Sequence, residues 1–308
     1  MTVLVREFRP EDAESTAEVL RAAIPFLVTT PEEIAWSTAH ANPAARYRLL
    51  VAEADGRIVA RGQVGLAHES TTPGQAYANV YVHPDHRGRG AGSLVLRTAE
   101  EHLAVAGART VYSWVLDEPA NRAFAERRGY RPSRSAHFLR LDLAHGTLPE
   151  PPEPPAGVEL RTAADFAADP RPLFELDAEV TADEPSDVGA ELDDYEDWLT
   201  STWGHPGQNR ELTVVAVVDG VPAAFTAVRT DGRGRYTSGM TGVRRAYRGR
   251  GLAKLVKAHS LHRARAAGCT EAFTGNDAGN EPMLAVNKWF GYDICATEVR
   301  HVRELALG

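Results

Sequence analysis

The chain repeats itself at an interval of about 160 residues, and this limits the folds open to it more than any other feature. VAEADGRIVA at 51–60 resembles VAVVDGVPAA at 215–224, so Asp219 follows Asp55 by 164 positions. YVHPDHRGRGAG at 81–92 resembles GVRRAYRGRGLA at 242–253 with a spacing of 161, and RRGY at 127–130 resembles WFGY at 289–292 with a spacing of 162. Three matches in one order indicate a duplication. Units of about 150 residues are whole domains, since solenoid repeats span only about 20–50 residues.

A proline-rich segment separates the two halves. Residues 146–157, GTLPEPPEPPAG, hold five prolines and show no hydrophobic periodicity. Such a composition is typical of an extended, semi-rigid connector. We therefore expect an N-terminal domain at 1–145, a linker at 146–157 and a C-terminal domain at 158–308.

Both halves predict the same order of elements. An opening strand leads to one or two helices, then to a hairpin with an Asp-Gly turn. A strand enters a glycine-rich turn, and a helix, a strand, a short helix and a last pair of strands follow. Strand–helix–strand after a hairpin predicts α/β domains of the α+β kind with a mixed sheet. The expected segments are Val3–Phe8, 76–82, 93–105 and 110–116 in the first half, and Val158–Leu160, 236–243, 254–266 and 271–274 in the second.

Composition argues against several kinds of partner. A net charge of −8 disfavours nucleic acid and anionic membranes, and mildly favours amine ligands. Cys269 and Cys295 form no C-x-x-C pair, so we expect neither a disulfide framework nor a metal site. The N-terminus does not resemble a signal peptide, and no segment approaches the ~20 apolar residues of a membrane span. We expect a cytoplasmic protein, either a monomer or a homodimer.

Two arginine- and glycine-rich turns each join a strand to a helix: RGRGAG at 87–92 and RGRGLA at 248–253. Glycine lets backbone N–H groups approach a ligand closely, and the start of a helix adds unpaired amides and the positive end of its dipole. Each turn therefore predicts a cradle for phosphate or pyrophosphate. A Walker loop fits poorly because Ala253 and Leu255 flank Lys254, and a Rossmann turn would need glycine in place of Ser93. A tight turn that binds nothing is the remaining alternative.

The pattern R-x-x-G-x-G/A, following a strand that ends in Val82-His83-Pro84, resembles the acyl-CoA-binding motif of the GNAT N-acetyltransferase superfamily. The pattern N-x-x-M-x-x-x-N-x-x-x-G-Y at 280–292 resembles the fourth helix of that superfamily. The resemblance covers nearly the whole chain twice, and implies two tandem GNAT-like domains that bind acetyl-CoA or coenzyme A. The cofactor-binding residues it implies are Val82, Arg87, Gly88, Arg89, Gly90, Ala91, Gly92, Ser93 and Asn121 in the first half, and Val243, Arg248, Gly249, Arg250, Gly251, Leu252, Ala253, Lys254, Asn276, Asn280 and Asn287 in the second.

The resemblance also implies a reaction, in which an amine of a small molecule or peptide attacks the thioester directly. The enzyme then supplies positioning and proton transfer. Many members carry a tyrosine, four residues before the final Gly-aromatic pair, that protonates the leaving thiolate; here the position is Ala125 or Asn287. An asparagine can donate a hydrogen bond to sulfur, although it is not an acid. We therefore expect catalysis in the C-terminal domain with Asn287 beside the sulfur, and Tyr236, Tyr292 or water as alternative proton donors.

Acidic residues between the first strand and the hairpin of the second half are candidates for the acceptor side. By the same resemblance this region caps the acceptor site, so Asp183 and Glu184 are candidates for holding the ammonium or relaying its proton. A solvated helix end is the alternative. Two other functions stay open at this point: an acyl-CoA-binding sensor or scaffold without turnover, and an N-terminal domain that binds CoA only for structure.

Overall fold

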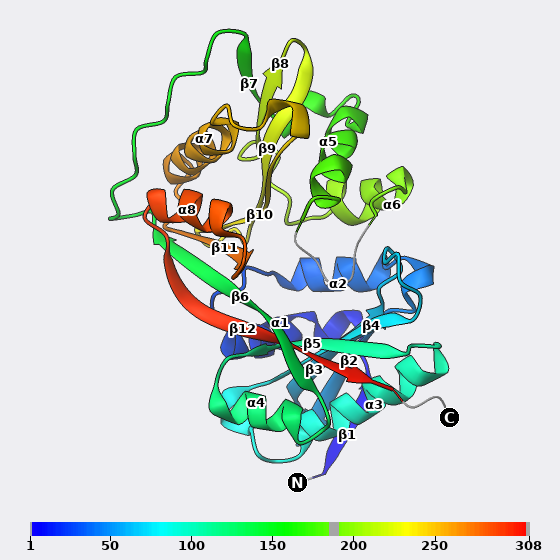
Figure 1. The fold of residues 1–308 in the computed structure, drawn as a ribbon. Coiled ribbons are helices and arrows are strands. Elements are labelled where there is room, and N and C mark those ends of the chain that lie inside the picture. The colour runs from blue at the N-terminus through cyan, green and yellow to red at the C-terminus, as the bar shows by residue number, and fades with distance from the viewer. Residues whose placement is uncertain (1, 185–190, 306–308) are drawn as a thin grey trace. The chain divides into compact units, whose positions relative to one another are not determined.

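The computed structural model describes residues 2–184 and 191–305. Two compact units are present: unit 1 consists of residues 1–136 and 296–308, and unit 2 of residues 137–295 (Figure 1). Each is an α/β unit with a mixed sheet, as the duplication predicts. No helix in the described part of the chain is both long and apolar enough to cross a membrane.

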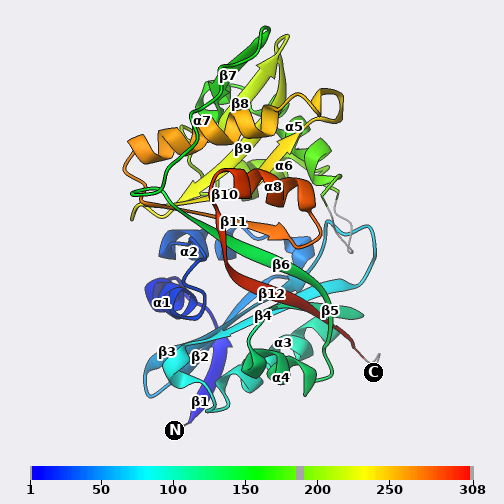
Figure 2. The ribbon, with the colours of Figure 1, turned by 60° about the vertical axis from the view of Figure 1, so that its left-hand side comes forward.

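The sheet of unit 1 is antiparallel except for one parallel pair, β4–β5. Helices α1 and α2 lie on one face and α3 and α4 on the other (Figure 2). Its strands, in spatial order, are β1 (Val3–Glu7), β2 (Arg48–Ala54), β3 (Arg57–Leu66), β4 (Gln75–Val82), β5 (Thr110–Leu116) and β12 (Asp293–Glu304). Its helices are α1 (Ala13–Ala23), α2 (Pro31–Ala39), α3 (Ala91–Val105) and α4 (Pro119–Glu126).

Unit 2 repeats this plan, with β10–β11 as the parallel pair. Helices α5 and α6 lie on one face of its sheet and α7 and α8 on the other (Figure 1). Its strands, in spatial order, are β7 (Val158–Thr162), β8 (Val214–Val218), β9 (Val221–Thr230), β10 (Arg235–Val243), β11 (Glu271–Asp277) and β6 (Arg131–Asp142). Its helices are α5 (Arg171–Thr181), α6 (Tyr195–Trp198), α7 (Leu252–Ala266) and α8 (Glu281–Trp289).

Each sheet is completed by a strand from the opposite half of the sequence. Residues 298–304 of β12 pair antiparallel with residues 110–116 of β5. Strand β6 lies beside β11, and just beyond it the Leu143 N–H donates to the Thr270 carbonyl at 2.9 Å. The expected final pair of strands in each half is therefore wrong, because one long strand ends each half. The units also depart from the expected domains at 1–145 and 158–308, because hydrophobic alternation does not say which edge a strand will join.

The Asp-Gly hairpins are confirmed. Asp55 and Gly56 both have positive φ, at +50° and +73°, and Asp219 and Gly220 have +51° and +82°. Two successive residues of positive φ match the right-handed twist of the strands that they connect. Both turns thus fix the register of β2 on β3 and of β8 on β9.

The proline-rich segment is held against α7 by hydrogen bonds to its carbonyl groups. The Nε2 atoms of His259 and His262 lie 3.0 Å and 2.9 Å from the carbonyl oxygens of Pro152 and Pro149. Farther along α7, the Arg265 guanidinium donates to the Gly146 carbonyl at 2.5 Å. Prolines cannot donate from the backbone, so these bonds use the acceptors that the segment does have.

Candidate functional site

Both glycine-rich turns have the backbone geometry that an anion cradle requires. Gly88 and Gly90 have φ of +75° and +89°, and Gly249 and Gly251 have +78° and +77°. A Cβ at any of the four would meet nothing within 4 Å, so backbone conformation and not crowding favours glycine there. Helices α3 and α7 begin directly after the turns, and no side chain caps either one. Their first N–H groups are left for a ligand.

A carboxylate restrains the first arginine of each cradle. In unit 1 the Arg87 guanidinium lies 3.5 Å from the Glu118 carboxylate. In unit 2 Asp183 accepts hydrogen bonds from both Arg245 and Arg248, and these lower the pKa of its carboxyl group to about 2. So acidic a group is a poor proton acceptor at neutral pH. Asp183 is thus positioned as a counter-ion of the cradle.

The candidate Glu184 and two other acidic residues of this region have separate surroundings. Glu184 is exposed, just beyond the end of α5. Asp177 accepts a hydrogen bond from Trp198 Nε1 at 2.8 Å, and burial raises the pKa of its carboxyl group. Glu179 forms an ion pair with Arg244 at 2.8 Å.

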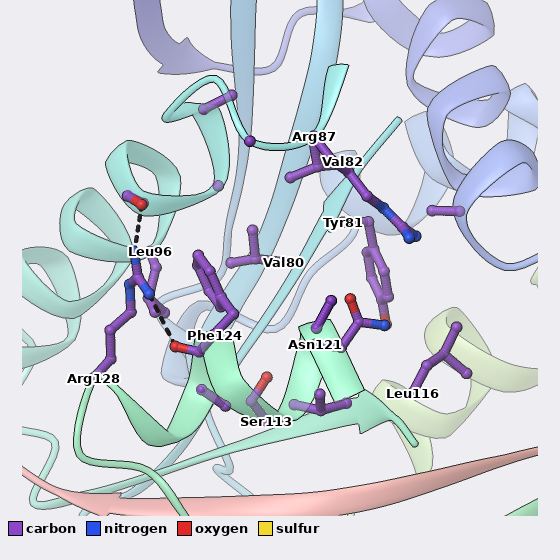
Figure 3. Close-up of a pocket in the computed structure, with 18 of the residues that line it drawn as sticks. Val80, Tyr81, Val82, Arg87, Leu96, Ser113, Leu116, Asn121, Phe124 and Arg128 are labelled. Atoms are coloured by element: carbon purple, nitrogen blue, oxygen red, sulfur yellow. Dashed lines mark hydrogen bonds between the residues drawn. The ribbon is translucent and has the colours of Figure 1, made fainter. Parts of the chain in front are cut away.

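Below the first cradle, strands β4 and β5 part and a cavity opens between them. They pair only through residues 75–77 and 110–112. Beyond that point the Asn79 side-chain oxygen accepts the Trp114 N–H at 2.9 Å across the gap. The cavity encloses about 510 Å³ and reaches the cradle (Figure 3). Its walls are largely apolar, and include Val80, Val82, Leu96, Val115, Leu116, Phe124 and Ala125.

Arg128 is a cavity residue that sequence reasoning missed. Its guanidinium lies 3.6 Å from the centre of the Phe124 ring, donates to the Phe124 carbonyl at 2.9 Å and bonds the Ser93 hydroxyl (Figure 3). Ser93 belongs to the first turn of α3, so a positive charge is fixed beside the cradle. The duplicate position is Phe290, and this departure from the repeat was the available signal.

In unit 2 the strand that enters the cradle carries a β-bulge. The pairing of β10 with β9 shifts register between Ser238 and Met240, which adds Gly239 to the strand. In unit 1 the pairing of β3 with β4 runs unbroken from 66↔76 to 60↔82. A bulge leaves its extra residue out of the ladder. Gly239 is exposed, and a Cβ there would meet nothing within 4 Å, so a ligand can approach this backbone closely.

Beside the bulge lies a buried chain of polar side chains. Lys257 Nζ donates to Asn287 Oδ1 at 2.5 Å and lies 3.3 Å from Ser238 Oγ, while Asn287 Nδ2 donates to Asn276 Oδ1 at 2.5 Å. The Lys257 side chain is 1% exposed and Asn287 is 0% exposed. Burial lowers the pKa of Lys257 to about 7. We name Ser238, Lys257, Asn276 and Asn287 the polar chain.

The structure thus brings some predicted residues together and separates others. Asn276 and Asn287 meet in the polar chain, whereas Asn280 caps α8 by accepting the Met283 N–H at 3.3 Å. Asn121 lines the cavity of unit 1 and donates to Glu118 at 3.1 Å. At the second cradle, Arg250 and Lys254 lie 5.2 Å and 4.8 Å from the rings of Tyr247 and Trp289. No sequence pattern had indicated Lys257.

Family comparisons agree with the duplication. A family model described as "Acetyltransferase (GNAT) domain" matches residues 45–132, and one described as "Acetyltransferase (GNAT) family" matches residues 173–292. The mycothiol acetyltransferase of Nocardia farcinica is 30% identical over 281 residues, covering 91% of this chain and 89% of that protein. The mycothiol acetyltransferase of Frankia casuarinae is 35% identical over 151 residues, which cover 49% of this chain and 44% of that protein.

A solved structure shows the same fold over the full length. The tandem GNAT protein from the clavulanic acid biosynthesis pathway aligns with a TM-score of 0.73 at 22% identity, over 98% of each chain. Two cradles, two parallel pairs of strands and these matches lead to one conclusion. The chain belongs to the GNAT family of acetyltransferases, as a tandem of two GNAT units.

Proposed function

We propose that unit 2 is the centre at which this enzyme moves an acetyl group from acetyl-CoA to an amine, and that unit 1 binds an acyl-CoA without turning it over. The donor and the reaction are those of the family. We assign transfer to unit 2 because its strand β10 contains a bulge at Gly239, whereas strand β4 of unit 1 keeps an unbroken register.

A bulge bears on catalysis because attack on the thioester builds negative charge on the carbonyl oxygen. An N–H that the bulge frees from the ladder is a preorganised donor for that oxygen. One such donor contributes about 10²–10³-fold in kcat in enzymes where it has been removed. In unit 1 the pairing of β4 with β3 contains no such insertion, so no bulge frees a backbone N–H of β4 in the same stretch.

In unit 2, residues of the turn 248–254 are proposed to hold the pyrophosphate, and Val243 with the end of β10 the pantetheine arm. The equivalent residues 87–93 and Val82 are proposed to hold acyl-CoA in unit 1, with Arg128 as an added cation. The acceptor is proposed to be a small molecule that presents a primary amine, because the most similar relatives are named mycothiol acetyltransferases. Asp177 on α5, which lies on the opposite face of the sheet from α7, is a candidate to receive the amine's proton, since its half-buried carboxyl group has a raised pKa.

Two matched variants test the assignment. Gly251→Asp places a carboxylate in the second cradle, where phosphate would be repelled, and Gly90→Asp does the same in the first. Turnover of acetyl-CoA with a panel of small primary amines, followed by acetylated product in a mass spectrometer, should be lost in Gly251→Asp and largely kept in Gly90→Asp. Calorimetric titration with CoA should show that each variant loses one site.

Loss of turnover from Gly90→Asp alone would reverse the assignment. Glu298, opposite Leu116 on β12, would then be the carboxyl group to examine in unit 1, because burial raises its pKa to about 7.

A further inference from the structure

We infer that Lys257 is the proton donor to the CoA sulfur that leaves in unit 2. This role rests on the proposed function of unit 2 as the transfer centre. The polar chain suggests this role, because its side chains come from α7, α8 and the two parallel strands β10 and β11 and meet beside the bulge.

The duplication supplies a direct control for the polar chain. The spacing of the repeat and the pairing of the strands make Ser238, Lys257, Asn276 and Asn287 equivalent to Ala78, Leu96, Val115 and Ala125. All four positions in unit 1 are apolar, and three of them line its cavity. The fold therefore does not need polar groups at these positions. Burying an amine is costly compared with an apolar side chain of similar size, so the exchange of all four together points to chemistry.

Lys257 occupies the position of a residue that lines the cavity of unit 1. Its counterpart Leu96 lies on the wall of the unit 1 cavity, where the two parallel strands part. Lys257 Nζ lies 3.3 Å from the hydroxyl of Ser238, the residue directly before the bulge. If the bulge holds the carbonyl oxygen of the thioester, the sulfur lies close by, because the oxygen and the sulfur are bonded to the same carbon atom. Lys257 is thus the residue of the polar chain that can carry a positive charge beside the bulge.

The groups around the amine leave it able to give up a proton. Among the residues that the structure describes, no carboxylate forms an ion pair with Lys257 Nζ. The titratable groups that face it are phenols: the Tyr292 ring centre lies 5.0 Å from Nζ, and Tyr236 on β10 bonds Ser260 one turn along α7. Burial raises the pKa of both phenols, so they stay neutral. Burial lowers the pKa of Lys257 to about 7, so both of its protonation states are populated near neutral pH.

The acceptor nitrogen bonds to the acetyl carbon, the carbon–sulfur bond breaks, and its electron pair goes to sulfur. The Lys257 ammonium gives one proton to sulfur and becomes an amine. The acetylated nitrogen loses one proton to a base or to water, and Lys257 regains a proton from solvent in the next cycle. Asn287 Oδ1 accepts a hydrogen bond from Lys257 Nζ and so orients the amine. Asn287 is therefore a positioning residue, at a position where many relatives carry an acid.

The thiol of bound CoA reports on Lys257 without any acceptor. In the Gly90→Asp protein only unit 2 should bind CoA, and thiolate formation is followed by its ultraviolet absorbance across a pH series. Lys257 and a neighbouring thiol titrate as a coupled pair, so thiolate should begin to form about one unit or more below the ordinary ~8.5 of a free thiol. Lys257→Met, which keeps the length of the side chain without its charge, should return the value to ~8.5 or above. Lys288→Met, the same change at an exposed lysine on α8, is the control and should leave it unchanged.

Steady-state kinetics provide a second test of the role of Lys257. Lys257→Met should lower kcat by about 10²-fold, with KM for acetyl-CoA changed by less than about threefold, and should remove the fall of kcat at high pH. If Lys257→Met fails to fold, the double variant Lys257→Leu, Asn287→Ala installs the residues that unit 1 already accommodates.

Two results would overturn the inference, and they differ. CoA bound by unit 2 with the same thiol pKa in wild type and Lys257→Met removes the role of Lys257 and leaves the proposed function intact. A Gly90→Asp protein that binds no CoA removes the proposed function, and the role of Lys257 with it.

Discussion

Unit 1 and unit 2 keep the same cradle and differ in the groove beneath it. Both carry two glycines of positive φ, an uncapped helix start and an arginine restrained by a carboxylate. Below the cradle, unit 1 has apolar side chains and an unbroken β4, while unit 2 has the polar chain and a bulged β10. The difference teaches that a duplicated enzyme can preserve the glycine-rich cradle in both copies while the side chains beneath it diverge.

Among the variants that test this difference between the units, deletion of Gly239 should have the largest effect on kcat. The deletion gives β10 the unbroken register of β4 and removes the freed N–H. We expect kcat to fall about 10²–10³-fold, as for loss of an oxyanion donor. Circular dichroism and calorimetric CoA binding check that the protein is folded and loaded. Full activity after the deletion would mean that the bulge does not distinguish the units.

The buried amine should make the stability of unit 2 depend on pH. The folded pKa of Lys257 is about 7, well below the 10.5 of an unpaired lysine, so the unfolded chain binds more protons between these values. Stability is therefore lowest at and below pH ~7 and rises toward pH ~9, by about 2 kcal/mol from this residue. Urea titrations at both pH values should show this rise in wild type and not in Lys257→Met. Leu96→Met in unit 1 is the matched control, and an equal rise in Lys257→Met would disprove the linkage.

Arg128→Met should weaken acyl-CoA binding in unit 1 alone. The variant removes the guanidinium that bonds Ser93 beside the cradle and keeps an apolar chain over Phe124. Loss of one charge-assisted contact should raise Kd for CoA about tenfold, measured by calorimetry in the Gly251→Asp background. Arg97→Met, at an exposed position on α3, the helix that carries Ser93, should leave Kd unchanged. An unaltered Kd in Arg128→Met would place the phosphates elsewhere.

Asp183→Asn should have the smallest effect and the opposite sign. The carboxylate competes with phosphate for Arg245 and Arg248, so its neutralisation should tighten CoA binding by unit 2 about two- to fivefold at low salt. The gain should shrink as salt is added, and Asp193→Asn, an exposed control, should show none. A loss of kcat with unchanged affinity would instead support the proton-relay role predicted from the sequence.

The sequence was sufficient for the repeated elements and the cradles. The strand 110–116 is found as predicted, and α3 and α7 begin two residues before the predicted starts at 93 and 254, directly after Gly90 and Gly251. These features depend on local rules: alternation, glycine turns and helix termination.

Features that depend on contacts between distant parts of the chain could not be predicted from local sequence patterns. Nothing local in the sequence around Thr110 indicates that β12 will be its partner, and Lys257 has the spacing of an ordinary buried helix position. Asn287 was singled out correctly as a residue inside the helix, but its partners Lys257 and Asn276 come from other elements. The bulge at Gly239 was also missed. It adds one residue to the second repeat, but the loop before it, 231–234, is four residues shorter than the loop 67–74, so the offset still falls from 164 to 161.

The exchange of strands also sets the order in which the molecule can be built on the ribosome. Thr110 and Glu304, which meet across β5 and β12, are 194 residues apart. At about 5–20 residues per second, β5 would be synthesised roughly 10–40 s before the strand that covers its edge. Unit 1 must spend that interval with an open edge, the kind of surface that recruits strands from other chains. Its native sheet closes only after β12 has been synthesised, so unit 1 is started before unit 2 and completed after it.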